Sequence, residues 1–268
     1  MITVIIIGLM AVTFAYFAQY KKLRFCLKIS FIIIFLFLAL RYDYGPDYNA
    51  YLEDFNEIKQ LNFDFKSIKD IWMNSMLVNI ILPESYESHT NLPTREPGWL
   101  TLCFLFKPLG FFPLVAFLAL FNCIVYYCFI KKYVPPAYYW LAVFLYVFTP
   151  NIMLVQSVIM RQTIVILIFI MSISYIYKKN FLQYALMIML AMLFHTSAII
   201  LLPLYLLGIL KVKMKKEVAI SVFFLFVMLI FLAEPVSQII NNVISSYIPR
   251  YAIYDEAGTV GTGLGIVF

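Results

Sequence analysis

The sequence predicts an all-α fold, a polytopic bundle of transmembrane helices, on three observations. Hydrophobic residues make up 64% of the 268 residues and charged residues only 13%, against about 45–50% and about 25% in soluble domains. Apolar runs near the length of about 20 residues that a membrane span needs recur from Ile2 to Ala233. These runs lack the alternation of a membrane β-barrel, so helices must satisfy the backbone within lipid.

The basic residues fall in short clusters between the apolar runs. The formal charge is +6, but four clusters, at residues 21–28, 131–132, 178–179 and 211–216, hold twelve of the twenty lysines and arginines and contain no acidic residue. Such a pattern indicates topology, with the basic loops on the cytoplasmic side, rather than nucleic-acid binding. The four cysteines have neither metal-ligand spacing nor the pattern of a disulfide framework.

The first part of the chain forms a hairpin and an outer loop in this interpretation. Spans at Ile2–Tyr20 and about Phe25–Leu40 flank the first basic cluster, so their turn is cytoplasmic. An extracytoplasmic loop, residues 41–98, follows and is rich in carboxylates. The next run is too long for one straight helix and contains proline and glycine. We therefore expect a re-entrant or tilted element near Trp99–Phe106 and a full span near Phe112–Ile130.

In the second part of the chain, the turns between spans again alternate between the cytoplasmic and the extracytoplasmic side. Spans near Tyr138–Val155 and Arg161–Tyr177 form a hairpin whose turn lies outside. Residues 181–210 lie between two lysine clusters, which predicts two half-length helices with an apex at 194–197, or alternatively one long tilted helix. A span at Val218–Ala233 follows. We treat residues 1–268 as one membrane domain, and we expect further C-terminal spans to be missing, because an apolar segment is starting where the chain ends.

Six ionisable residues, Asp43 and five candidate site residues, lie at or near the outer face in this topology. Ionisable groups within spans are costly in lipid and often mark a cavity or pathway. The arginines suit phosphate oxygens or snorkel at the interface. The histidine could accept a proton or be a structural residue, and the carboxylates could act as bases, orient the arginines or simply be solvated. The five candidate site residues are Arg41, Asp47, Glu96, Arg161 and His195.

Tyrosines follow the second span closely, at Tyr42, Tyr44, Tyr48 and Tyr51. Aromatic rings near the interface usually anchor a helix in the membrane, and they can also stack on sugar faces. The two histidines are distant in sequence, and no span carries an acidic cluster, so we expect no metal site.

Four short motifs resemble those of a known family. They occur at residues 41–51 (RYDYGPDYNAY), 96–99 (EPGW), 160–162 (MRQ) and 194–199 (FHTSAI). In their order and their placement against the spans, the chain is similar to members of the EpsG family, Wzy-type polymerases of bacterial O-antigen and capsular polysaccharide. The resemblance covers most of the chain.

The resemblance implies a glycosyltransferase in the bacterial cytoplasmic membrane, active at its extracytoplasmic face. Its substrate would be an oligosaccharide linked to undecaprenyl pyrophosphate, with membrane lipid, a flippase and a chain-length regulator as partners and no nucleic acid, metal or cofactor. We assign pyrophosphate binding to Arg161 and Arg41, the catalytic base to His195, with Asp47 or Glu96 second, and sugar binding to Tyr48 and Tyr51. A lipid-linked glycan ligase and a non-enzymatic transporter or flippase are the alternatives.

Overall fold

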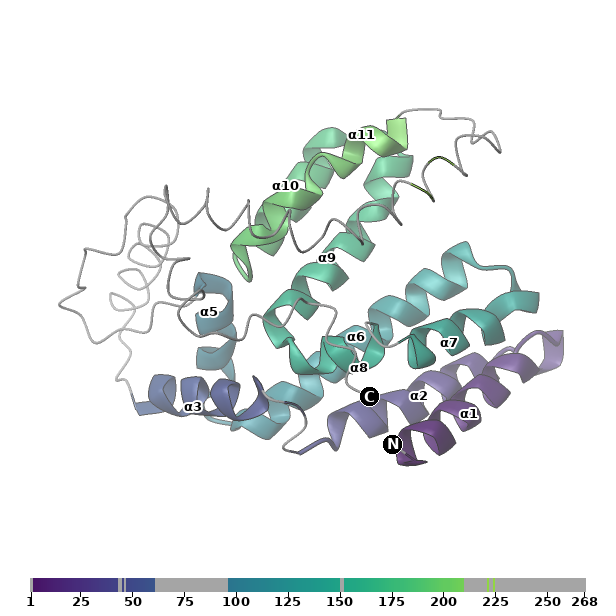
Figure 1. The fold of residues 1–268 in the computed structure, drawn as a ribbon, viewed down its shortest axis with the longest axis horizontal. Coiled ribbons are helices and arrows are strands. Elements are labelled where there is room, and N and C mark those ends of the chain that lie inside the picture. The colour runs from purple at the N-terminus through teal and green to yellow at the C-terminus, as the bar shows by residue number, and fades with distance from the viewer. Residues whose placement is uncertain are drawn as a thin grey trace. The chain divides into compact units, whose positions relative to one another are not determined.

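The computed structural model describes residues 2–42, 45, 47–60, 96–149, 152–209, 221 and 224. The chain divides into two compact units, and the helices below belong to the unit made of Met1–Met76 and Pro93–Ile209. Each secondary-structure element in these residues is helical (Figure 1), as predicted. In chain order they are α1 (Ile2–Phe17), η1 (Lys21–Leu23), α2 (Cys26–Ala39), α3 (Asp47–Gln60), α5 (Pro97–Phe106), α6 (Phe111–Tyr133), η2 (Pro136–Tyr138), α7 (Tyr139–Phe148), α8 (Met153–Val158), α9 (Met160–Tyr177), α10 (Phe181–Met192), η3 (Thr196–Leu201) and α11 (Leu204–Ile209).

Two of the described helices, α6 with 23 residues and α9 with 18, are long and apolar enough to cross a membrane. They coincide with the expected spans at Phe112–Ile130 and Arg161–Tyr177 to within about three residues. The helices α1 and α2 are also apolar, with 16 and 14 residues, and occupy the first two expected spans. The expected span at Val218–Ala233, apart from Ser221 and Phe224, and loop residues 61–95 lie outside the described residues.

The helices α2, α6 and α9 run in the directions that the basic clusters predict. The C-terminal ends of α6 and α9 lie together, because Tyr133 stacks on Tyr177 with ring centroids 5.7 Å apart. Toward their other ends, Leu118 of α6 and Met160 of α9 line one pocket with Leu38, near the end of α2. Thus α6 and α9 are parallel and α2 is antiparallel to both. The basic clusters bordering these helices gather at one end of the bundle, away from the pocket.

A short helix, α5, precedes the long helix α6, as expected. The helix α5 has 10 residues, a rise of about 15 Å, and it ends before the turn that contains Gly110. This glycine has a φ of +100°, a conformation that other residues rarely adopt. Pro108 and Gly110 therefore separate α5 from α6. The break predicted within this long apolar run is confirmed.

The span expected near Tyr138–Val155 ends earlier than its predicted bound, at the point where the turn of this hairpin was expected to begin, Thr149-Pro150. The helix α7 ends at Phe148, and Thr149 is extended, with φ −75° and ψ 119°. Pro150 follows in the sequence, and a proline disfavours helical conformation in the residue before it. The chain resumes with the short α8, which begins at Met153.

Residues 181–209 form a hairpin of two short arms, α10 and the η3–α11 segment. The hydroxyl of Tyr184, near the start of α10, donates to the carbonyl oxygen of Leu201. The Tyr184 ring also packs on Tyr205 of α11, with centroids 5.4 Å apart. The arms are therefore antiparallel, and their turn includes His195. Of the two predicted alternatives, the pair of half-length helices is confirmed and the single tilted helix is not.

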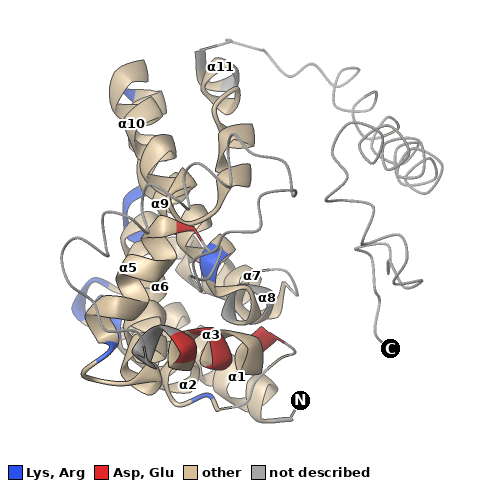
Figure 2. Cartoon of the chain, turned by 90° about the vertical axis from the view of Figure 1, so that its left-hand side faces the viewer, with Lys and Arg blue, Asp and Glu red and all other residues tan. Residues whose placement is uncertain are grey.

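The helix α3 brings part of the segment expected to form the outer loop onto the bundle. Its residues Tyr48, Tyr51 and Phe55 recur at helical spacing and are all buried. Tyr48 packs edge-on against Phe111 of α6, with centroids 5.4 Å apart. Figure 2 shows acidic residues concentrated on α3, whereas the apolar helices are almost free of charge. This amphipathic helix lies beside the site described below, because its Tyr51 packs on Trp99 of α5.

Candidate active site

Glu96 is held in place by the backbone at the start of α5. It is extended, with φ −61° and ψ 139°, and the next residue, Pro97, occupies the first helical position, where the fixed φ of proline suits a helix. The amide N–H of Gly98 donates to the carbonyl oxygen of Leu193 at 2.7 Å. A Cβ on Gly98 would lie only 2.7 Å from that oxygen. Glycine thus allows α5 to approach the α10–η3 turn, which carries His195.

His195 lies between α10 and η3 and points its ring at Glu96. Its backbone is extended, and its N–H donates to the carbonyl oxygen of Ala191 at 3.1 Å. The ring Nδ1 is 2.8 Å from Oε1 of Glu96. An ionised carboxylate only accepts hydrogen bonds, so a neutral ring carries its proton on Nδ1 and its lone pair on Nε2. The carboxylate therefore sets the tautomer of His195.

Arg161 reaches the same carboxylate from the first turn of α9. Its Nη1 donates to Oε2 of Glu96 at 2.5 Å, and its guanidinium carbon lies 5.7 Å from the centroid of the Tyr51 ring, within the range of a cation–π interaction. The side chains of Arg161 and Glu96 are 22% and 10% exposed, so the ion pair is largely removed from water. The buried Nε of Arg161 has no hydrogen-bond partner among the described residues.

The carboxylate of Glu96 is ionised at neutral pH. Burial by itself would raise the pKa of the Glu96 carboxyl, but the hydrogen bond from His195 and the positive charge of Arg161 outweigh it. The pKa therefore lies below its ordinary value of 4.5. One buried negative charge thus holds a cation on one oxygen and an imidazole on the other.

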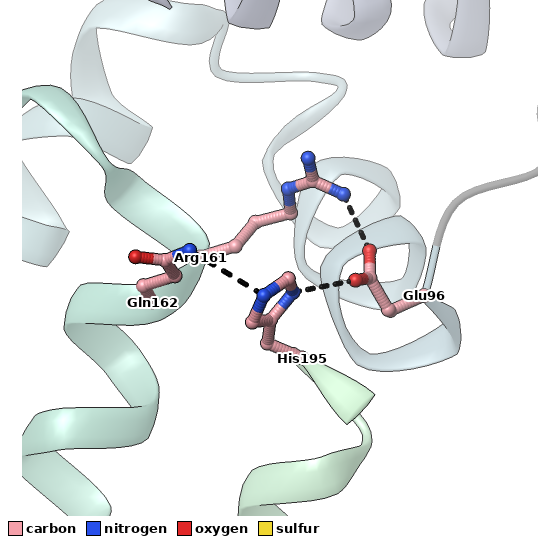
Figure 3. Close-up of polar contacts among 4 residues, drawn as sticks. All are labelled: Glu96, Arg161, Gln162 and His195. Carbon is pink, nitrogen blue, oxygen red and sulfur yellow. Dashed lines mark hydrogen bonds and ion pairs between the residues drawn. The ribbon is translucent and has the colours of Figure 1, made fainter. Parts of the chain in front are cut away.

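Gln162 completes the cluster, which Figure 3 shows in close-up. Its amide Nε2 lies 3.4 Å from Nε2 of His195, the ring nitrogen that Glu96 does not contact. The cluster therefore joins the start of α5, the first turn of α9 and the turn of the 181–209 hairpin. These three segments are far apart in sequence.

Arg41 lies elsewhere, in a pocket on another face of α9. The pocket is small, about 10 Å³, which is room for about one water molecule, and it is partly open to the surroundings. Arg161 follows Met160, a pocket residue, by about 100° around the helix and reaches α5 instead. The structure brings together Glu96, Arg161 and His195 but places Arg41 beside this cluster rather than within it. The pocket is lined by Leu38, Arg41, Leu118, Ala119, Asn122, Met160 and Thr163.

The other expected site residues lie on α3. Asp47 is its first residue and, within the described part of the chain, contacts none of the cluster residues. Tyr48 is 2% exposed and Tyr51 is 7% exposed, so neither ring offers a free face to a sugar. Tyr51 instead packs on Trp99, with centroids 5.1 Å apart, and supports Arg161.

Two polar residues in this region escaped the sequence reasoning as site candidates. Gln162 was noticed only as part of a motif, although a polar side chain in the first turn of an apolar helix is itself a signal. Asn122 is 3% exposed in α6 and accepts a hydrogen bond from the Tyr146 hydroxyl at 2.9 Å. A lone amide in the middle of an expected span would have indicated it. In the described ranges, no group of three or more His, Cys, Asp or Glu residues could hold a metal ion.

Apolar helices with basic clusters at one end and a half-buried Arg–Glu–His cluster toward the other define a helical membrane protein with a polar site. The family model of EpsG matches residues 24–268, and the chain belongs to the EpsG family. This membership confirms the resemblance found in the sequence and associates the chain with surface polysaccharide biosynthesis. Comparison with curated proteins and with solved structures found no match.

Proposed function

We propose that the protein is a polymerase of bacterial surface polysaccharide, which joins repeat units carried on undecaprenyl pyrophosphate. The observation that carries this proposal is the Glu96 carboxylate, which holds Arg161 on one oxygen and His195 on the other. Glycosyl transfer from a lipid pyrophosphate needs a cation for the leaving group and a base for the acceptor. The cluster supplies both groups within one site.

The reaction exchanges one bond for another at the anomeric carbon of the donor sugar. A hydroxyl oxygen of the acceptor bonds to that carbon and loses its proton to Nε2 of His195. The bond from the carbon to the pyrophosphate oxygen breaks, and its electron pair leaves with the pyrophosphate. Arg161 stabilises the charge that develops on the leaving group, while Glu96 stabilises the imidazolium that forms.

Arg161 can take up a phosphate without leaving the carboxylate completely. Only its Nη1 donates to Glu96, and its buried Nε has no hydrogen-bond partner among the described residues. An unsatisfied buried donor costs about 1–3 kcal/mol, and a small movement of the guanidinium would let an anionic oxygen reach and satisfy it. The first turn of α9 adds the positive end of a helix dipole to the same place.

Arg41 is proposed to bind a phosphate of a lipid-linked substrate at the open mouth of its small pocket, which is itself too small to hold the phosphate. The apolar pocket residues suit a lipid environment, and the guanidinium suits a phosphate. We do not carry Asp47 or the two tyrosines forward as catalytic or sugar-binding residues. Tyr51 is instead proposed to hold the guanidinium of Arg161 in place.

The proposed setting is the outer face of the bacterial cytoplasmic membrane, in a multi-pass protein. Support comes from the basic clusters, which gather at the end of the described bundle opposite Arg161. The lipid-linked repeat unit would come from a flippase, and a chain-length regulator would act with the polymerase.

Deletion of the gene in a producing strain tests the activity. We expect surface glycan with single repeat units in place of long chains, and plasmid-borne wild-type protein should restore the long chains. Complete loss of surface glycan would instead favour a flippase. Unchanged chain length would reject the proposal.

Arg161→Lys tests the assigned phosphate contact. Lysine keeps the charge but loses the planar fork, so we expect elongation to fall about tenfold or more, at unchanged protein abundance. Arg24→Lys is the matched control, because Arg24 is exposed in the turn between α1 and α2. A normal glycan ladder in the Arg161→Lys strain would contradict the role of Arg161.

A further inference from the structure

The ring nitrogen of His195 that would accept the proton, Nε2, is covered by the side-chain amide of Gln162. Glu96 occupies Nδ1, so the lone pair lies on Nε2, and the Gln162 amide nitrogen is 3.4 Å from it. An amide N–H can donate to that lone pair, but the separation is longer than the usual 2.7–3.2 Å for a strong bond. The contact between the Gln162 amide and Nε2 of His195 is therefore weak enough for a substrate hydroxyl to displace it.

Gln162 also lies on the open side of the cluster. It is exposed, whereas Glu96 is buried. The preceding residue, Arg161, points at the other oxygen of the Glu96 carboxylate (Figure 3). Two successive residues of α9 therefore contact the two partners of the Glu96–His195 pair. A substrate held by Arg161 would lie next to the Gln162 amide.

We propose that Gln162 is a positioning residue for the acceptor in glycosyl transfer, an inference that rests on the proposed function. Its amide covers Nε2 of His195. When the acceptor hydroxyl donates to that nitrogen, the amide turns away and holds the acceptor sugar. An amide both donates and accepts hydrogen bonds, which suits neighbouring sugar hydroxyls, and three rotatable side-chain bonds allow the movement. The proton still passes from the acceptor oxygen to Nε2.

Chemical modification of the full-length protein in detergent tests the cover without any substrate. Diethyl pyrocarbonate acylates a neutral imidazole nitrogen, and peptide mass spectrometry distinguishes His195 from His89. Gln162→Ala should raise the modification rate of His195 about fivefold, the effect of one neutral hydrogen bond. Gln162→Glu should slow it at neutral pH and move its pH dependence to higher pH, because a nearby carboxylate favours the protonated ring.

Gln183→Ala is the control, because Gln183 is exposed near the start of the neighbouring α10. We expect its His195 to react at the wild-type rate. If Gln162→Ala also reacts at the wild-type rate, the amide does not cover Nε2 and the inference is overturned.

Elongation by membranes tests the positioning role. With lipid-linked repeat units extracted from the deletion strain, Gln162→Ala and the shorter Gln162→Asn should each lower the rate about fivefold at limiting repeat unit. The loss should be smaller at saturation. His195→Ala separates the two proposals: normal elongation in that variant would refute the proposed base. An inactive His195→Ala together with unimpaired Gln162 variants would refute only the inference about Gln162.

Discussion

Glu96→Gln is the substitution that examines the cluster most directly. Glutamine keeps the shape of the side chain but has one acceptor oxygen in place of two. Its NH₂ group must then face either Arg161 or His195, which are both donors toward the carboxylate. If the amide oxygen stays with Arg161, the imidazole must move its proton from Nδ1 to Nε2 and can no longer accept one from a substrate.

The magnitude follows from the contact that is lost. A hydrogen bond to a charged group contributes about 1.5–3 kcal/mol. Since the side chain of Arg161 is 22% exposed, water offsets part of this, and a value of about 2 kcal/mol is reasonable. At about 1.4 kcal/mol for each factor of ten, elongation should slow at least about 30-fold. The loss of the correct tautomer would add to that figure.

The assay is glycan elongation by membranes from the deletion strain that express each variant, with immunoblotting to match protein abundance. Glu53→Gln serves as the control, because Glu53 is exposed on α3. We expect this control to elongate within about twofold of wild type, since an exposed charge away from the site contributes little. Wild-type elongation by Glu96→Gln at equal abundance would show that the carboxylate does not organise the site.

Three further outcomes are expected. The lowered pKa of Glu96 implies that its ion pair is fully present above the ordinary value of 4.5 and is lost as pH falls through the lowered pKa. Thermal stability in detergent should therefore drop in acidic buffer for wild type but less for Glu96→Gln. Gly98→Ala should reduce stability by about 1–3 kcal/mol, measured by thermal unfolding, because its Cβ would crowd the Leu193 carbonyl. Tyr51→Leu should slow elongation about two- to thirtyfold, whereas Tyr51→Phe keeps the ring beside Arg161, loses only the interaction of the hydroxyl with the guanidinium, and should have a smaller effect.

Much of the helical framework could be predicted, because the apolar period and the basic clusters are properties of local sequence. The predicted span Arg161–Tyr177 differs from the observed α9 by one residue at its start. The hairpin at 181–210 was expected because a lysine cluster borders the segment on each side. Thr149-Pro150 was expected to begin a turn, and α7 does end there, but the short helix α8 within that turn was not expected and the span was extended too far, to Val155.

The site was harder to predict than the helices. The topology predicted from the basic clusters placed Arg161, His195 and Glu96 on one side of the membrane. The pairing of Glu96 with Arg161 and with His195, which lie 65 and 99 residues away in sequence, depends on how the helices pack. The same uncertainty explains why Arg41 was grouped with Arg161, although it lies on another face of α9. The burial of Tyr48 and Tyr51 followed from α3, a helix that we had treated only as loop.

The bond from the Gly98 amide to the Leu193 carbonyl joins main chain to main chain. It sets the spacing between the acid and the imidazole without using any side chain. Residues that face the sugar could consequently diversify among homologues that build different glycans, while the separation of the reacting groups stayed constant. A backbone hydrogen bond of this kind would let one fold build many different polysaccharides, provided that residue 98 remains glycine.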